Sequence, residues 1–135
     1  MREKAKILLV DDQPDFLEPI AFLLKSNGYE VLLANNGAAA LEIITTNKPQ
    51  IVCMDIVMPE MDGLETLAKI REMDKDLPVI MLTGHPDEEN QAKARSLGIT
   101  EFFPKRGNVW QLPTIIEKTL KKPKSSPSDQ SNKEK

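Results

Sequence analysis

Three short apolar runs in this chain each lead into a side chain that carries oxygen. The runs at 7–10, 51–54 and 79–82 end at Asp11, Asp55 and Thr83. A carboxylate at the tip of a buried strand loses its hydration, and this loss is costly unless a cation or hydrogen-bond donors compensate it. In an open parallel sheet, however, ligands bind at the carboxyl ends of the strands. The pattern therefore predicts a parallel sheet whose strand ends form a small, anionic, oxygen-rich site.

Segments typical of helices separate these runs and two further β-rich segments. The predicted strands cover 4–10, 30–34, 51–54, 79–82 and 101–103, and the helices cover 14–26, 38–46, 64–73, 88–97 and 109–121. Pro14 suits the first turn of its helix, Asn27-Gly28 ends that helix, and Pro19 favours a bend within it. This alternation is typical of βαβ units with helices on both faces of the sheet. We expect an α/β fold, a doubly wound, five-stranded parallel sheet with five flanking helices.

The length of 135 residues suffices for one ordinary domain, which we expect at residues 1–120. Residues 121–135 are rich in Lys, Ser and Pro and contain no large apolar side chain, so a disordered tail or linker is predicted there. The single cysteine, Cys53, lies in an apolar run and is predicted to be a core residue.

The charge and hydropathy of the chain exclude two classes of partner. Because five lysines and two acids lie in 121–135, residues 1–120 carry 13 basic and 19 acidic residues, a net charge of −6. Such an acidic domain is unsuited to binding the phosphates of nucleic acids. No apolar run approaches the roughly 18 residues of a membrane span. We expect a cytoplasmic domain without direct nucleic-acid or membrane binding.

The predicted site contains the chemistry of a metal-assisted phosphoryl acceptor. Asp11, Asp12 and Asp55 would repel one another unless a cation lay between them, and an all-oxygen ligand set favours Mg²⁺. An aspartate pair before Pro14 also suits the start of a helix, which is the structural alternative for Asp11 and Asp12. A carboxylate beside Mg²⁺ is a possible nucleophile toward phosphorus. Thr83 and Lys105, at later strand ends, are candidate ligands of the phosphoryl oxygens, although both residue types are common there without function.

Between residues 4 and 120 the sequence resembles the response-regulator receiver domain of two-component signalling. The matching positions are Asp11-Asp12, Asp55, the loop from Met58-Pro59 to Asp62-Gly63, Thr83, Phe102 and Lys105. The resemblance implies a flavodoxin-like receiver fold in which Asp55 accepts a phosphoryl group. It also implies Mg²⁺ held by Asp12, Asp55 and the backbone carbonyl of Val57, with Asp11 acting mainly through water. Thr83 and Lys105 would bind the phosphoryl oxygens.

The resemblance further implies a switch and a set of partners. Thr83 would move toward the phosphoryl group, Phe102 would fill the vacated space, and the surface of the fourth helix, fifth strand and fifth helix would change. The phosphoryl donor would be a sensor histidine kinase or a histidine phosphotransfer protein. The recipient of the signal would be a downstream effector protein or an output domain lost from this chain, and the same surface would serve a homodimer. Apart from self-phosphorylation and self-dephosphorylation, the domain would not be an enzyme.

Two positions differ from the usual pattern of the family, and two others are ones that tune the lifetime of the phosphorylated state. In the family a proline usually follows the lysine in a cis bond, whereas here Pro104 precedes Lys105 and Arg106 follows it. We therefore expect a different shape for the loop that enters the last helix. Phe102 replaces the more common tyrosine and lacks its hydroxyl. Val57 and His85 occupy the positions that tune phosphate lifetime: Val57 cannot orient a water, whereas His85 either does so or is a solvated loop residue.

Three other classes of protein share parts of this pattern. A haloacid-dehalogenase-like phosphatase requires a general-acid aspartate two residues after the nucleophile, where this chain has Val57. A flavin- or nucleotide-binding flavodoxin-like protein requires Gly, Ser or Thr in the first loop, where this chain has Asp11-Asp12-Gln13-Pro14. A receiver-like interaction module that acts without phosphorylation is the third alternative, because of the displaced Pro104.

Overall fold

The computed structural model describes residues 5–58, 60–84, 88–99, 101–105 and 107–121. Except for Lys121, the segment for which we predicted a disordered tail lies outside the described residues. No helix in the part of the chain that is described is both long and apolar enough to cross a bilayer.

Five strands form one parallel sheet in the order β2-β1-β3-β4-β5. The strands are β1 (Lys6–Val10), β2 (Glu30–Ala34), β3 (Ile51–Asp55), β4 (Val79–Thr83) and β5 (Glu101–Pro104). β3 and β4 are buried along their whole length, as expected for parallel strands covered on both faces. The ladder continues past the apolar runs, because the Ile56 N–H donates to the Leu82 carbonyl at 3.1 Å. Asp55 is therefore the last residue of its strand instead of the first residue of a loop.

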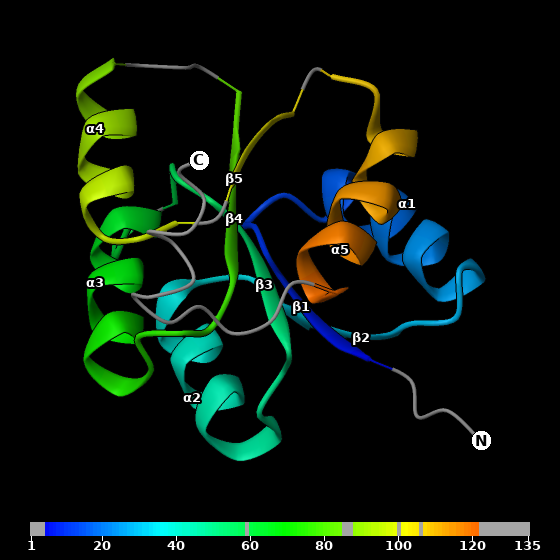
Figure 1. Cartoon of the computed structure of the whole chain (residues 1–135), viewed down its shortest axis with the longest axis horizontal. Coiled ribbons are helices and arrows are strands. Elements are labelled where there is room, and N and C mark those ends of the chain that lie inside the picture. Colours follow the sequence, from blue (N-terminus) through cyan, green and yellow to red (C-terminus); the bar gives the residue numbers. More distant parts are fainter. Residues whose placement is uncertain (1–4, 59, 85–87, 100, 106, 122–135) are drawn as a thin grey trace, which may run out of the picture.

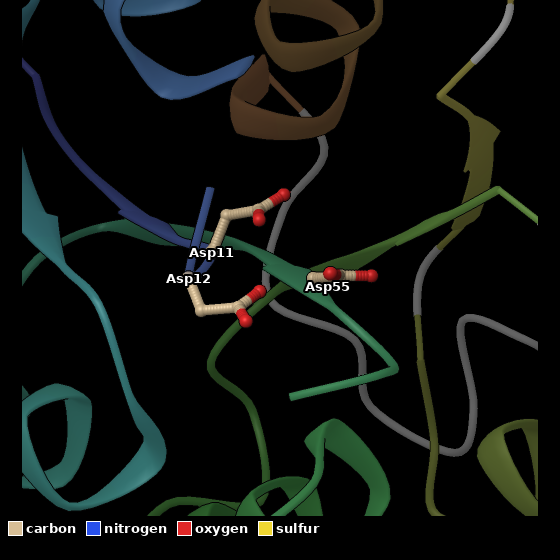
Figure 2. A group of neighbouring side chains, drawn as sticks. All are labelled: Asp11, Asp12 and Asp55. Carbon is tan, nitrogen blue, oxygen red and sulfur yellow. The ribbon is translucent and has the colours of Figure 1, made fainter. Parts of the chain in front are cut away.

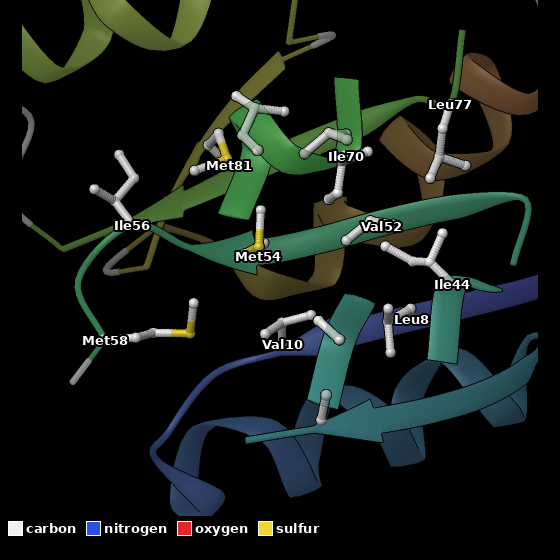
Figure 3. Packing of buried hydrophobic residues seen from close by; sticks show 14 of the residues in the cluster. Leu8, Val10, Ile44, Val52, Met54, Ile56, Met58, Ile70, Leu77 and Met81 are labelled. Atoms are coloured by element: carbon white, nitrogen blue, oxygen red, sulfur yellow. The ribbon is translucent and has the colours of Figure 1, made fainter. Parts of the chain in front are cut away.

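Helices cover both faces of the sheet, as predicted for a doubly wound fold (Figure 1). Figure 1 shows α1 (Pro14–Ser26) and α5 (Leu112–Lys121) on one side, and α2 (Gly37–Asn47), α3 (Gly63–Met73) and α4 (Glu88–Ser96) on the other. Each side encloses its own apolar cluster. Figure 3 shows the cluster beneath α2 and α3, in which Val10, Val52 and Met54 of the sheet meet Ile44 and Ile70 of the helices.

The prediction of one continuous helix at 109–121 is wrong in its first turn. A 3-10 turn, η1 (Val109–Gln111), precedes α5. The side chain of Asn108 accepts a hydrogen bond from the Trp110 N–H at 3.0 Å, which starts this tighter turn. Pro113 has no N–H to donate to a preceding α-helical turn, so the regular helix begins at its immediate neighbour, Leu112. The bounds of the other elements agree with prediction to within one or two residues.

Two contacts at helix ends fix the elements around the sheet. At the start of α3, Asp62 and Glu65 form a reciprocal capping box between their side chains and backbone N–H groups. Behind the end of α4, the Arg71 guanidinium of α3 donates to the carbonyls of Leu97 and Gly98, both at 2.9 Å. Carbonyls at the end of a helix have no intrahelical hydrogen-bond partner, and Arg71 supplies a donor for these two.

The order of the strands reverses between β1 and β3. The chain leaves β1 for β2 on one side of the sheet, whereas it leaves β3 for β4 on the other. Loops that follow two such adjacent strands diverge to opposite faces, and a crevice opens at the carboxyl edge between them. This is the edge at which Asp11, Asp12 and Asp55 lie.

Candidate functional site

Three aspartates meet at the carboxyl ends of β1 and β3. Asp11 and Asp12 follow β1 directly and Asp55 ends β3, so adjacent parallel strands deliver all three side chains to one place (Figure 2). One carboxylate oxygen from each lies within 4.8 Å of the other two. Asp11 is fully buried and Asp55 is 5% exposed, whereas Asp12 is exposed to solvent. The predicted convergence of these side chains is therefore present in the structure.

Local hydrogen bonds orient the two buried carboxylates. The Gln13 N–H donates to Asp11 Oδ1 at 2.9 Å, and the Val57 N–H donates to Asp55 Oδ1 at 3.3 Å. Each aspartate thus uses one oxygen to accept from the loop that follows its strand. The second oxygen of each, Oδ2, is left to face the ammonium of Lys105.

Lys105 links the acidic cluster to the far side of the sheet. Its Nζ lies 2.8 Å from Asp11 Oδ2 and 3.3 Å from Asp55 Oδ2. Its backbone N–H donates to the Thr83 carbonyl at 2.8 Å, which fixes the start of the side chain beside the end of β4. Asp11 Oδ2 accepts no well-aligned hydrogen bond from the residues described, so the nearby ammonium is what compensates its buried charge.

The ionisation of these groups reflects burial and mutual charge. Burial, followed by the charge of Asp11, raises the pKa of Asp55, although Lys105 and the Val57 N–H act in the opposite direction. Burial alone would lower the pKa of Lys105, but its contacts with Asp11 and Asp55 outweigh burial and raise that pKa. The site therefore holds more negative charge than its environment favours, and a bound cation would relieve this excess.

The donor set fits Mg²⁺. Its oxygens come from carboxylates alone, which suits a hard divalent cation and not zinc or copper. Mg²⁺ usually binds through one or two carboxylates and keeps several waters, and the exposure of Asp12 leaves room for such waters. Val57, whose carbonyl is implied as a further ligand, lies in the loop after β3 and is 69% exposed. Its role as a ligand stays a prediction.

The two predicted switch residues lie on neighbouring strands. Thr83 is buried at the end of β4, opposite Pro104 of β5 in the sheet register. Phe102 lies two residues earlier on β5, is half-buried and packs against the cluster beneath α2 and α3. The guanidinium of Arg95 on α4 lies over the Phe102 ring, 5.1 Å from its centroid. The aromatic ring thus contacts both the sheet and α4.

The displaced proline ends β5. Pro104 is the last strand residue, a position at which its missing N–H breaks no interior ladder. The Gly107 N–H donates to the Pro104 carbonyl at 2.9 Å, and a Cβ on Gly107 would lie only 2.9 Å from Pro104 Cγ. Glycine therefore lets the chain turn back tightly over the proline ring after Lys105. His85, Pro59 and Arg106, which we singled out in the sequence, lie outside the described residues.

Sequence reasoning missed two residues that contact Lys105. Gln13 Oε1 accepts a hydrogen bond from Lys105 Nζ at 2.9 Å, and Nζ lies 4.5 Å from the centroid of the Phe16 ring. Both residues belong to the start of α1, directly after the acidic pair. Their position in the first loop was the signal available, but the contact spans 92 positions in the sequence.

The fold and the site define a receiver: a doubly wound parallel sheet with an acidic cluster and a lysine at its carboxyl edge. The family model for the response regulator receiver domain matches residues 7–117. The chain therefore belongs to the response regulator receiver domain family and is the receiver domain of a response regulator.

Known relatives agree with this assignment. Response regulator MprA of Mycobacterium sp. (strain KMS) is 36% identical over 100 residues, which are 74% of this chain and 44% of that protein. The chain thus spans less than half the length of this relative. An uncharacterized 14.6 kDa protein in the sodA1 3′ region of Leptolyngbya boryana is 34% identical over 113 residues, 82% of this chain and 86% of that protein.

Solved structures show the same fold. The CheY-like response regulator receiver domain protein from Methanospirillum hungatei JF-1 superposes with a TM-score of 0.84 at 28% identity, covering 98% of this chain and 100% of that chain.

Proposed function

We propose that this domain accepts a phosphoryl group on Asp55, in the presence of Mg²⁺, from a histidine kinase or a histidine phosphotransfer protein. The observation that carries the proposal is the arrangement around Asp55. A buried carboxylate at a strand end lies beside two further carboxylates and within 3.3 Å of a lysine ammonium. This combines a nucleophile, a site for a divalent cation and a fixed positive charge. A surface hollow lined by residues 12–16 opens beside the cluster and gives a donor room to approach.

In the proposed transfer, a carboxylate oxygen of Asp55 forms a bond to phosphorus while the bond from phosphorus to the donor imidazole nitrogen breaks. The electron pair of the broken bond stays on the imidazole, which then takes a proton from solvent. Asp12 and Asp55, with the Val57 carbonyl, would hold Mg²⁺, and Asp11 would act through water. Bound there, Mg²⁺ supplies positive charge that offsets the phosphoryl oxygens. The Lys105 ammonium and the Thr83 hydroxyl bind these oxygens directly.

The signal is then carried by Thr83 and Phe102. When Thr83 turns toward the phosphoryl group, Phe102 moves into the space it leaves, and the surface of α4, β5 and α5 changes. Phosphorylation shifts a pre-existing equilibrium, because its contacts favour one of two states. The contact of Arg95 with the Phe102 ring supports a link to α4, since that contact must change when the ring moves.

The partners follow from the same role. The changed surface would bind a downstream effector protein, an output domain or a second copy of the domain. A direct role in nucleic-acid binding is disfavoured by the net charge of −6 on residues 1–120. The domain would not turn over an external substrate, and its chemistry would be limited to gaining and losing its own phosphoryl group.

Substitution of the acceptor tests this function. The wild-type domain should take up one phosphoryl group from acetyl phosphate with Mg²⁺, as measured by intact mass or by phosphate-affinity electrophoresis. Asp55→Asn should take up none, because the amide is not a nucleophile toward phosphorus. Asp76→Asn is the matched control, because Asp76 is an exposed aspartate between α3 and β4, at the opposite edge of the sheet from the acidic cluster. Phosphorylation of Asp55→Asn, or none of the wild type, would favour an interaction module that acts without phosphate.

A further inference from the structure

Lys105 is surrounded by four groups, two of which come from the start of α1 and have no role in the transfer described above. Its ammonium has three N–H donors and faces three oxygens: Asp11 Oδ2 at 2.8 Å, Gln13 Oε1 at 2.9 Å and Asp55 Oδ2 at 3.3 Å. The Phe16 ring covers a further side at 4.5 Å. The ammonium donates hydrogen bonds to the oxygens of Gln13 and Asp55, its contact with Asp11 is an ion pair, and its side chain is only 13% exposed.

The side chain of Gln13 is turned toward the lysine and away from its own helix. Gln13 is the N-cap residue of α1, where a polar side chain commonly accepts a hydrogen bond from the first turn. Its side chain makes no such bond, and its oxygen instead accepts from Lys105. At the same time its backbone N–H holds Asp11 Oδ1 at 2.9 Å. Gln13 thus fixes both partners of the ion pair between Asp11 and Lys105.

Phe16 forms an aromatic side of the surroundings of the Lys105 ammonium. Its ring is half-buried and packs against the apolar cluster between the sheet and helices α1 and α5. Its N–H donates to the Gln13 carbonyl at 3.0 Å, which ties the two residues together in the first turn. An aromatic face within about 6 Å of an ammonium attracts it electrostatically, and more strongly when water is excluded. The ring therefore stabilises the ammonium at this place without adding negative charge.

We propose that Gln13 and Phe16 are positioning residues that hold the Lys105 ammonium at the edge between Asp11 and Asp55 for phosphoryl transfer. This inference rests on the proposed function. The longest of the three polar contacts is the one to Asp55, so this contact is exchanged for a phosphoryl oxygen while Asp11 and Gln13 stay in place. Because Gln13 is a neutral acceptor, it satisfies a proton of the ammonium without repelling the incoming phosphoryl group.

Two substitutions separate this role from general packing. Gln13→Met has nearly the same shape but no acceptor oxygen, and Phe16→Leu keeps an apolar side chain without an aromatic face. Their matched controls are Gln111→Met and Phe22→Leu, which make the same changes at exposed positions, the second of them on the same helix. Folding of each variant is checked by its amide NMR spectrum, and exposed Gln13 provides a variant that leaves the core intact.

The first measurement needs neither metal nor phosphate. Hydrogen exchange of the Lys105 ammonium is followed by ¹⁵N NMR of the metal-free protein, with the signal assigned by its loss in Lys105→Met. Exchange should accelerate by about three- to tenfold in Gln13→Met and Phe16→Leu, because each removes one interaction of the ammonium. The two controls should stay within about twofold of the wild type. Unchanged exchange in both test variants would overturn the inference.

The second measurement is the rate of Asp55 phosphorylation by acetyl phosphate at saturating Mg²⁺. Both test variants should lower the maximal rate by about three- to tenfold and leave the half-saturating donor concentration within about twofold. The reason is that a misplaced lysine stabilises the transition state of phosphoryl transfer less well, with a smaller effect on the initial binding of acetyl phosphate. Faster ammonium exchange with an unchanged rate would also overturn the inference. If the wild type takes up no phosphoryl group, the proposed function fails; if it does and both variants equal it, the inference alone fails.

Discussion

Gly63 is where a helix approaches the backbone of the acceptor strand. A Cβ on this residue would overlap the carbonyl oxygen of Asp55 and lie 2.8 Å from the Cα of Ile56. The Gly63 N–H also donates to the Ile56 carbonyl at 2.7 Å, so the helix cannot retreat without losing a hydrogen bond. Replacement of Gly63 by alanine must therefore move either α3 or the end of β3.

The loss in the free energy of unfolding can be estimated from these contacts. Overpacking of a close contact costs about 1–3 kcal/mol, and a strained backbone hydrogen bond adds about 1 kcal/mol. Alanine recovers about 0.4–1 kcal/mol by restricting the unfolded chain. We expect Gly63→Ala to lower the free energy of unfolding by about 2 kcal/mol, and to slow phosphorylation of Asp55 where the end of β3 is the part that moves.

Urea unfolding measures this loss. With a urea dependence of about 1–3 kcal/mol per molar, the midpoint should fall by about 1 M. Gly84→Ala is the matched control at the end of the neighbouring strand, because the nearest atom to its Cβ is Lys105 Cδ at 4.0 Å. This control should stay within about 0.5 kcal/mol of the wild type. Equal stabilities of Gly63→Ala and Gly84→Ala would refute the close-approach argument.

Two further predictions concern charge and the end of α4. Because the folded pKa of Asp55 is raised, the folded state binds its proton more tightly, and stability is lost as pH rises from about 4 through that pKa. Asp55→Asn should therefore be more stable than the wild type in urea at pH 7, and a gain that persisted unchanged below pH about 4 would contradict this cause. Arg71→Lys keeps the charge but not the planar fork that reaches Leu97 and Gly98, and should cost about 1–2 kcal/mol. Amide exchange near the end of α4 should accelerate, whereas equal exchange in both proteins would count against the role of Arg71.

The sheet and the centre of the site could be predicted from the sequence because both depend on local patterns. Buried parallel strands read as continuous apolar runs, and residues at their carboxyl ends meet at one edge of the sheet. Asp11, Asp55 and Lys105 could be brought together on this ground alone, and the ion pairs among them agree with it. Their roles in phosphoryl transfer are still predictions.

Other features could not be predicted because they depend on distances between segments that are remote in sequence. Nothing in the first loop shows that Gln13 would reach Lys105, or that Arg71 would cap the end of another helix. The need for glycine at position 63 likewise arises from a separation between helix and strand that only the packed structure defines.

The sparse anchoring of α4 has a consequence for the evolution of signalling specificity. Of its nine residues, Ala94 alone is buried, and the helix end is held by backbone carbonyls that any sequence supplies. The remaining side chains of α4 are not buried in the core, so they can be replaced at little cost to stability. After gene duplication, a copy of this domain could acquire a new recipient through changes in α4, while the residues of the proposed phosphoryl-transfer site stayed the same.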